Sequence, residues 1–301
     1  MKKILIDWIA FTLVKEKEEA PVINLFPLSP QDFSPLPKGG LGYKKIIACS
    51  GIKIFTDGAE SMGVHTQISG QGCRFLEALG VDLWAFLSEK KKEKDLKFTR
   101  LDIALDVDTD LITPCVESIR KGLYISKSRS IKLYEKIGED KKMHVETIYI
   151  GSRSSKVFFR IYDKAKQMKV GGIWQRIEAE VKKDYIITLI EKLESSISDT
   201  FCGLLLSYFR PISKKESNIS RSPTADYWLK LIGECKKVTL YREPKKKGVE
   251  EKFLWIDSQV APTVALLSEA FGGYEWIEAV AKRAKSRVKP IDWKILEEEK
   301  L

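Results

Sequence analysis

Tyr162 stands among basic residues in the segment KVFFRIYDK (156–164). In a β-strand alternate residues share one face, so Arg160, Tyr162 and Lys164 are predicted to project together. A phenol has a pKa of about 10 and becomes a useful nucleophile only when nearby cations or a metal ion stabilise its charged form. Arg160 and Lys164 are placed to stabilise a phenolate and to hold a phosphate. The segment therefore predicts a tyrosine nucleophile for phosphoryl transfer at a phosphodiester.

Two further segments, FTRLDIALDVD (98–108) and WQRIEAEVK (174–182), also place charges on one strand face and apolar residues on the other. The charged residues on these faces are Arg100, Asp102, Asp106, Arg176, Glu178, Glu180 and Lys182. The carboxylates of Asp102, Asp106 and Glu178 are hard oxygen ligands, which Mg²⁺ and Mn²⁺ prefer. Such an ion would polarise a scissile phosphate and neutralise the charge that develops on it.

Each of the three strands alone also fits a plainer interpretation. A solvent-facing strand of an antiparallel sheet alternates apolar and charged residues, and its exposed ion pairs contribute little to stability. All three strands fall within an 85-residue window, however. If they are neighbours in one sheet, their carboxylates, guanidinium groups and phenol converge on a single face and form a site.

The chain of 301 residues carries a net charge of +10, of which +8 falls in residues 91–225, the part that contains the three charged strands. Such an excess is expected of a protein that binds a polyanion, nucleic acid most often. A solvated lysine-rich surface gives the same balance. No run of about 18 apolar residues occurs, so the sequence predicts a cytoplasmic protein without a membrane span.

Cysteine and histidine give no sign of a zinc site. The five cysteines include no CxxC pair and are expected to be reduced. The two histidines, His65 and His144, lie 79 residues apart, so a His-hydrophobic-His metal motif is absent. Carboxylates would therefore have to bind a metal ion instead.

Strand-like runs separated by turn residues, with a few helical stretches between them, extend to about residue 209. Hairpin-sized gaps predict an α+β fold, with a large, mainly antiparallel sheet, helices packed on it and a mostly helical C-terminal part. The polar connection RPISKKESNISRSPTA (210–225) places a domain boundary near residue 222. The two predicted parts are residues 1–222 and residues 223–301, the second containing a hairpin over 236–257.

A short internal similarity connects two of the strands. LIDWIAFTL (5–13) and RLDIALDV (100–107) both place an aspartate inside an apolar strand. So few residues cannot establish a duplication.

The segments FTRLDIALD, IYIGSRSSKVFFRIYDKAKQ and QRIEAEVK, in this order and at these separations, resemble the Rep_trans family of replication initiation factors. The N-terminal IDWIAFT and GVHTQISGQGCR and the late WLKLIG and WIDSQVAPTVALL are also similar to that family. The family includes initiators of rolling-circle replication in plasmids and phages, and relaxases of integrative conjugative elements. The resemblance implies a site-specific enzyme that nicks and rejoins one DNA strand.

The resemblance also implies roles for individual residues. Tyr162 would attack the scissile phosphate, giving a 5′-phosphotyrosine intermediate and a free 3′-OH. Arg160 and Lys164 match the basic positions that flank the tyrosine, and Arg176 matches the arginine of the R-x-E motif. The acidic positions of the Mg²⁺ or Mn²⁺ site correspond to Asp102, Asp106, Glu178 and Glu180.

Residues 1–222 would then be the nicking and joining domain, and residues 223–301 are a candidate region for DNA recognition. The expected partner is an origin with a single-stranded or cruciform nick site, and the family also suggests a homodimer and contact with a helicase. Two alternatives remain: a relaxase that starts conjugative transfer by the same chemistry, and a DNA-binding protein without catalytic activity. A topoisomerase or tyrosine recombinase is disfavoured, because its helical cluster of catalytic Arg and His is not visible.

Overall fold

The structure is a computed structural model that describes residues 3–138, 141, 143–233, 238, 240, 249–288, 293 and 297. The chain divides into two compact units, Met1–Arg242 and Glu243–Leu301, and each is described by itself. No helix among these described residues is both long enough and apolar enough to cross a membrane.

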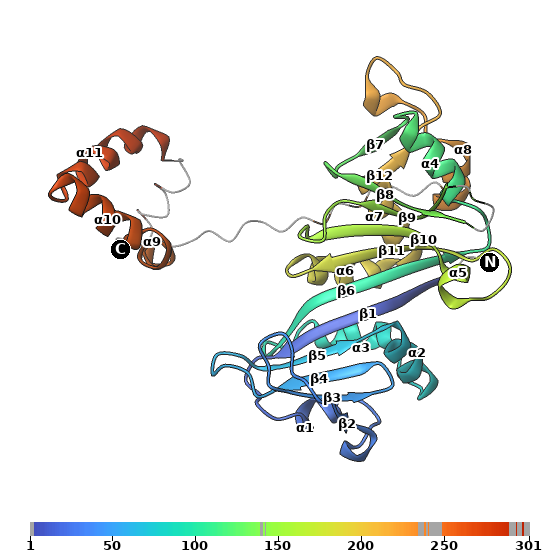
Figure 1. Cartoon of the computed structure of the whole chain (residues 1–301), viewed down its shortest axis with the longest axis horizontal. Coiled ribbons are helices and arrows are strands. Elements are labelled where there is room, and N and C mark those ends of the chain that lie inside the picture. The colour runs from blue at the N-terminus through green and yellow to red at the C-terminus, as the bar shows by residue number, and fades with distance from the viewer. Residues whose placement is uncertain are drawn as a thin grey trace. The chain divides into compact units, whose positions relative to one another are not determined.

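A ten-stranded antiparallel sheet forms the frame of the first unit (Figure 1). The strand order is β2-β3-β4-β5-β1-β6-β11-β10-β9-β8, and a separate pair joins β12 to β7. The strands of the large sheet are β1 (Lys3–Leu13), β2 (Ser34–Pro35), β3 (Lys45–Cys49), β4 (Ile52–Thr56), β5 (Val64–Ile68), β6 (Leu96–Val107), β8 (Ile131–Ile137), β9 (Met143–Ile150), β10 (Val157–Asp163) and β11 (Gln175–Lys182). The small pair consists of β7 (Tyr124–Ser126) and β12 (Phe209–Pro211). The predicted mainly antiparallel sheet is thus confirmed.

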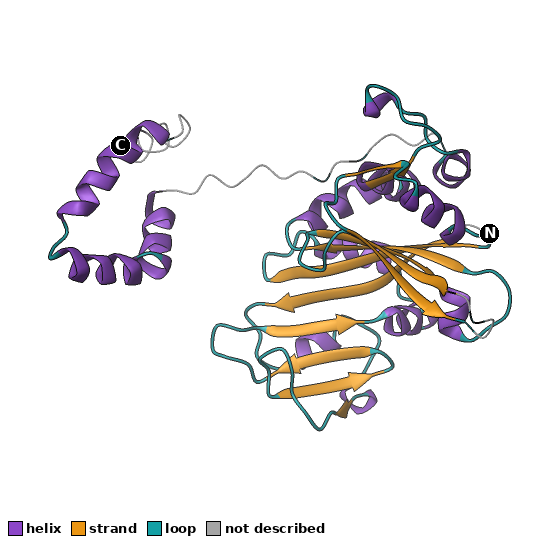
Figure 2. Ribbon diagram, turned by 45° about the horizontal axis from the view of Figure 1, so that its top comes forward, coloured by secondary structure: helices purple, strands orange, loops and turns teal. Residues whose placement is uncertain are grey.

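The helices of the first unit cover one face of this sheet and its ends (Figure 2). They are α1 (Ala20–Ile23), α2 (Gly70–Ala78), α3 (Leu83–Lys90), α4 (Ile112–Arg120), α5 (Lys164–Met168), α6 (Tyr185–Ser195), α7 (Ile197–Tyr208) and α8 (Asp226–Ile232), with 3₁₀ turns at Pro30–Asp32 (η1) and Ile219–Arg221 (η2). Ser196 separates α6 from α7, because its side chain accepts a hydrogen bond from the backbone N–H of Asp199 and caps the second helix.

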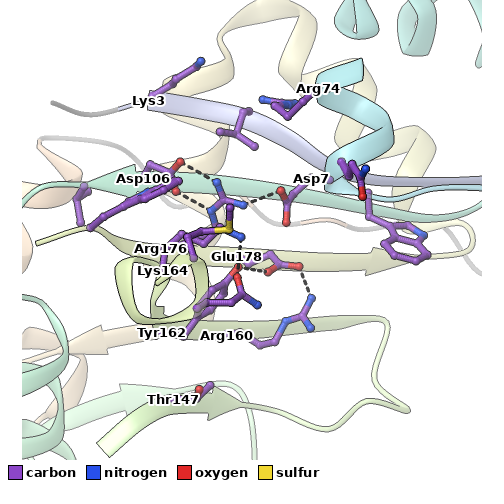
Figure 3. Close-up of a pocket in the computed structure, with 18 of the residues that line it drawn as sticks. Lys3, Asp7, Arg74, Asp106, Thr147, Arg160, Tyr162, Lys164, Arg176 and Glu178 are labelled. Carbon is purple, nitrogen blue, oxygen red and sulfur yellow. Dashed lines mark hydrogen bonds and ion pairs between the residues drawn. The ribbon is translucent and has the colours of Figure 1, made fainter. Parts of the chain in front are cut away.

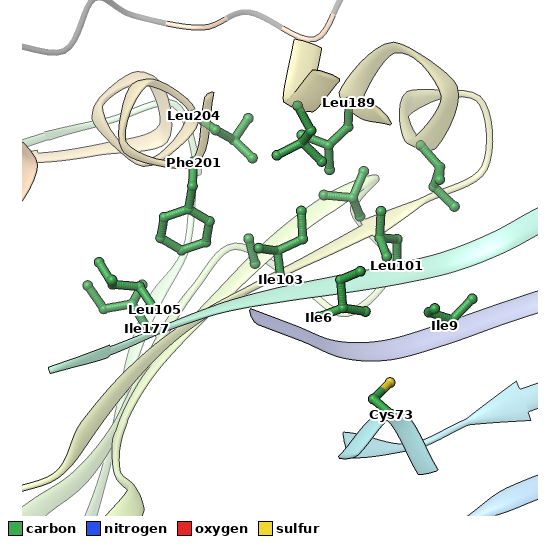
Figure 4. Close-up of a cluster of buried hydrophobic side chains, with 14 of the residues drawn as sticks. Ile6, Ile9, Cys73, Leu101, Ile103, Leu105, Ile177, Leu189, Phe201 and Leu204 are labelled. Atoms are coloured by element: carbon green, nitrogen blue, oxygen red, sulfur yellow. The ribbon is translucent and has the colours of Figure 1, made fainter. Parts of the chain in front are cut away.

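The hydrophobic core lies between the sheet and helices α6 and α7 (Figure 4). Alternate residues of β6, such as Leu101 and Ile103, are fully or almost fully buried on this side and face Leu189 and Phe201 of the helices. Since the apolar residues of each strand are used here, its charged residues must lie on the opposite face. The core thereby fixes which face of the sheet carries the site.

The first unit continues beyond the sequence-predicted boundary near residue 222. Helix α8 packs into the core, where the indole of Trp228 is fully buried with its ring 5.5 Å from that of Phe209. The first unit therefore ends at Arg242, and the polar connection at 210–225 belongs to it, beginning in β12 and including the turn η2.

The second unit is helical in its described part and contains α9 (Val249–Gln259), α10 (Ala261–Phe271), α11 (Glu275–Ala284) and the turn η3 (Lys285–Arg287). Gly272, at φ 72°, ends α10 in the left-handed conformation that favours glycine. The expected helical C-terminal part is confirmed. Of the hairpin predicted over 236–257, the first part lies mostly outside the described residues, and the second part, from Val249, forms a helix.

Candidate active site

The three charged strands are neighbours in the sheet, in the order β6-β11-β10. Arg176 of β11 lies directly opposite Asp106 on one side and Tyr162 on the other, and Glu178 lies opposite Arg160. Residues that are opposite in antiparallel strands project to the same face. The charged faces therefore converge, as the alternation of the sequence predicts.

A cavity of about 1110 Å³ lies over this face of the sheet (Figure 3). Strands β1 and β9, the residue that follows β6, the start of α2, helix α5 and the segment before β11 supply the rest of its lining. The sequence-predicted site residues that line it are Asp106, Arg160, Tyr162, Lys164, Arg176 and Glu178. Asp102 and Glu180 lie next to these residues but are not part of the lining.

The hydroxyl of Tyr162 points at the carboxylate of Glu178 and donates a hydrogen bond to Oε2 over 3.2 Å. Burial and the negative charge of Glu178 raise the pKa of Tyr162, so the phenol is protonated at neutral pH. The ammonium of Lys164 lies 5.9 Å from the centre of the phenol ring. Burial and the charge of Arg176 lower the pKa of Lys164, which makes this lysine a better proton donor than one in water.

Arg176 is 4% exposed and connects two carboxylates. Its Nε and Nη2 donate to Asp106 over 2.6 and 2.7 Å, and its Nη1 donates to Asp7 over 2.6 Å. Burial alone lowers the pKa of Arg176, but the bonds to Asp106 and the charge of Asp7 outweigh it and raise the pKa. The guanidinium is therefore permanently charged and holds both carboxylates at one position.

Asp7 is the main site residue that the sequence did not assign. It lies at an irregularity in the β1–β6 pairing, where Ile6 pairs with Ile103 but Trp8 pairs with Asp102. Asp7 shares a strand face with Lys3 and Leu5, which also line the cavity, and the bulge brings Trp8 to that same face before Ile9 returns to the core. Burial raises the pKa of Asp7, and the charge of Arg176 opposes that shift. The only signal in the sequence is the aspartate inside the apolar run LIDWIAFTL.

Asp102 and Glu180 belong to a buried ion-pair network behind the cavity wall. The Asp102 side chain is 1% exposed and accepts hydrogen bonds from Arg100, over 2.8 and 2.5 Å, and from Arg160, over 3.2 Å. Burial raises the pKa of Asp102 well above its usual range, and the hydrogen bonds from Arg100 oppose that shift. Glu180 binds Arg100 over 3.1 Å and Lys182 over 2.6 Å. The network fixes Arg160, which also pairs with Glu178.

Aromatic and basic side chains that the sequence did not assign complete the cavity. The guanidinium carbon of Arg100 lies over Trp8, 4.7 Å from the centre of the indole ring. The guanidinium carbon of Arg176 lies 5.9 Å from the ring centre of Trp174. Tyr149 stacks on Phe158 with ring centres 5.8 Å apart and an angle of 10°. Lys3 and Arg74 add positive charge at the β1 and α2 end of the cavity.

The carboxylates of the cavity fit a divalent ion by donor type, because Asp7, Asp106 and Glu178 all line it. In the described part of the chain no group of three or more His, Cys, Asp or Glu is arranged to hold a metal ion. The carboxylate oxygens are occupied by Arg176, Arg160 and Tyr162. A metal ion would therefore need at least one guanidinium to turn toward another anion.

The fold and the site define an α+β protein whose antiparallel sheet carries a tyrosine, arginines and carboxylates in one cavity. Residues 96–280 match the model of the replication initiation factor family, Rep_trans, and residues 3–85 match the model of the N-terminal domain of rolling-circle replication initiation proteins. The first match alone covers more than half of the chain. The chain belongs to the replication initiation factor family.

A solved structure supports the fold independently. The rolling-circle replication initiator protein from Geobacillus stearothermophilus matches with a TM-score of 0.72 and 24% sequence identity, over 80% of this chain and 100% of that chain. The two proteins share their fold. No curated protein matches the chain.

Proposed function

We propose that this protein starts rolling-circle replication by nicking and rejoining one DNA strand at an origin, with Tyr162 as the nucleophile. One observation carries the proposal: the Tyr162 hydroxyl lies in a 1110 Å³ cavity, bonded to Glu178 and close to Arg160, Lys164 and Arg176. A phenol, a proton acceptor and three cations are what transesterification at a phosphodiester requires. Family membership supports the same reaction.

In the proposed step the Tyr162 oxygen attacks the scissile phosphorus and its proton passes to Glu178. A bond forms between the tyrosine oxygen and phosphorus, and the bond between phosphorus and the 3′ oxygen breaks. The 3′ oxygen leaves with the bonding electrons and takes a proton, and Lys164, whose pKa is lowered, is the proposed donor. The reverse reaction, with a 3′-OH as the nucleophile, rejoins the strand.

The arginines have electrostatic and positioning roles in this proposal. Arg160 lies two positions before Tyr162 on the same strand and Arg176 lies opposite it on β11, and the charge of each lowers the free energy of the phenolate. The incoming phosphate is an anion, like the carboxylates that Arg160 and Arg176 bind in this structure. DNA binding therefore competes with Glu178 and Asp7 for these guanidinium groups, and this competition frees carboxylate oxygens.

We propose Mg²⁺ or Mn²⁺ as the accompanying ion, held by Asp106 and Asp7 and by the Glu178 oxygen that does not take the Tyr162 proton. Such an ion supplies Lewis-acid stabilisation of a phosphate oxygen. The buried positions of Asp102 and Glu180 favour a supporting role, in which they orient Arg100 and Arg160. Binding of Mn²⁺ by Asp106 is measured without reference to activity by paramagnetic broadening of the protein's NMR signals, with Asp106→Asn as the comparison.

The test of the nucleophile uses supercoiled DNA that carries the presumed origin, with Mg²⁺ or Mn²⁺ present. Tyr162→Phe removes one oxygen and is expected to abolish both the nick and the covalent protein–DNA adduct. Tyr149→Phe is the matched control, because Tyr149 lines the same cavity and the substitution removes the same atom. A Tyr162→Phe protein that still forms the adduct would overturn the assignment. Origin DNA is the partner expected here, and the homodimer and helicase contact stay predictions.

A further inference from the structure

A second cavity, of about 480 Å³, lies at the other end of β10 and shares no lining residue with the first. Its lining comes from the segment before β8, from the segment between β9 and β10, from the start of β10 and from the helices α6 and α7. It contains three basic residues, Lys127, Arg129 and Lys156, together with four serines, and no carboxylate lines it. The cavity is therefore positively charged throughout its described lining.

Its lysines are held by aromatic rings and not by carboxylates. The ammonium of Lys156 lies 4.8 Å from the ring centre of Tyr185, and that of Lys127 lies 5.4 Å from the ring centre of Tyr208. Among the residues that the structure describes, no Asp or Glu lies within salt-bridge distance of either lysine. A ring positions a cation but does not neutralise it. The two charges thus stay available for an anion.

Hydrogen-bond donors surround these charges. Burial, and the nearby Tyr185, raise the pKa of Tyr208, so its phenol keeps its proton and can donate it. Gly151 has a φ of 97°, which favours glycine, and the chain turns here beside Ser128. A Cβ added to Gly151 would lie 3.2 Å from the Ser128 Oγ, so a larger residue would crowd this hydroxyl. Cations with hydroxyl donors around them are the recognition chemistry of a phosphate group.

The cavity lies apart from the nucleophile. Lys156 precedes Tyr162 by six positions along the chain, which corresponds to about 20 Å in an extended strand. Tyr185 and Tyr208 belong to α6 and α7, which pack on the sheet face opposite the catalytic cavity. A phosphate bound here would therefore belong to a part of the DNA outside the catalytic cavity.

We infer that the cavity around Lys127 and Lys156 binds a backbone phosphate of the same DNA, outside the catalytic cavity. The inference rests on the proposed function, because it takes DNA as the substrate. Lys127 and Lys156 contact the phosphate, and the rings of Tyr185 and Tyr208 position the two lysines. The cavity adds affinity for the DNA backbone without reading the bases.

The test measures the binding of the full-length protein to a fluorescent single-stranded oligonucleotide of mixed sequence over a range of KCl concentrations. The double variant Lys127→Gln/Lys156→Gln removes two positive charges and keeps most of the side-chain length. Removal of one lysine–phosphate interaction with a single strand reduces the slope of log K against log salt by about 0.7. The expected result is a slope reduced by about 1.4, with roughly 25-fold weaker binding near 0.1 M salt.

The control is Lys45→Gln/Lys53→Gln, which removes the same charge from two exposed positions on β3 and β4. Its salt slope is expected to match that of the wild type. Equal slopes for the two double variants would overturn the inference while leaving the proposed function intact. Absence of DNA binding by the wild type would instead remove the proposed function itself.

A last measurement separates DNA from a free anion. In one outcome, inorganic phosphate raises the Tm of the wild type but not that of Lys127→Gln/Lys156→Gln. If the two double variants also show equal salt slopes for DNA binding, the cavity binds free phosphate and the inference fails. Circular dichroism of both double variants establishes that they are folded.

Discussion

Replacement of Arg176 by methionine should make the stability of the protein depend strongly on pH. Arg176 is almost completely buried and is bonded to both Asp7 and Asp106. Methionine fills a similar volume but leaves the two carboxylates facing each other without a cation. Breaking a buried ion pair by removing one partner costs about 3–5 kcal/mol, because the other charge stays buried. We expect a decrease of this size in the free energy of unfolding at neutral pH.

Acid should restore part of this stability. Burial already raises the pKa of Asp7, and Arg176 is the principal group that opposes the shift. Without Arg176 the folded protein holds the Asp7 proton still more tightly than the unfolded chain does. Stability then rises as pH falls through this raised pKa and is lost as pH rises through it. From about pH 7.5 to about pH 5 the destabilisation should shrink by about 1–3 kcal/mol, at about 1.4 kcal/mol per pKa unit.

Urea unfolding followed by circular dichroism at several pH values measures this effect. Arg210→Met is the matched control, because Arg210 is similarly buried but donates to the backbone carbonyls of Ser220 and Ser222 and to Thr224. Its cost should be the same at every pH in this range. If the cost of Arg176→Met is also independent of pH, the electrostatic account of the site is refuted.

Two further changes test the site. Glu178→Gln keeps the shape of the side chain but removes the proton acceptor of Tyr162. The single-turnover rate of nicking should therefore fall by about 10²–10⁴-fold, while DNA affinity is unchanged or rises. An unaltered rate would assign the proton to another group. Gly70→Ala places a Cβ 2.6 Å from Asp7 Oδ1, so the carboxylate must move. Urea unfolding should show a free energy of unfolding lower by about 1–3 kcal/mol. Nicking activity should fall as well. The Asp7→Ala/Gly70→Ala double variant should be no less stable than Asp7→Ala alone, and fully additive destabilisation would show that the two side chains do not meet.

The charged face could be predicted because alternation is a local property of each strand. The period of two places Arg160 with Tyr162, and Asp102 with Asp106, without knowledge of the neighbours of either strand. The strand order β6-β11-β10 depends on contacts between distant parts of the chain. From the sequence alone, convergence of the charged residues on one face could be predicted only on the condition that the three strands are neighbours.

Depth within the sheet and local irregularities could not be predicted. Asp102 and Asp106 have the same residue type and the same face, but the structure buries Asp102 behind Arg100 and Arg160 and leaves Asp106 in the cavity wall. The bulge between Ile6 and Trp8 interrupts the period of two, so that Asp7 and Trp8 both line the cavity while Ile6 and Ile9 lie in the core. The boundary near residue 222 was placed on composition, which does not reveal that Trp228 completes the core.

The bond between Arg176 and Asp7 joins residues 169 positions apart, one from the first strand of the chain and one from the eleventh. During synthesis Asp7 leaves the ribosome first, and at about 5–20 residues per second Arg176 follows roughly ten to thirty seconds later. Until then β1 and β6 can pair, but the strands that carry Arg176 and Glu178 have not yet been made. A nascent or prematurely terminated chain therefore lacks the completed cavity, and under the proposed function an unfinished copy would be unable to cut DNA.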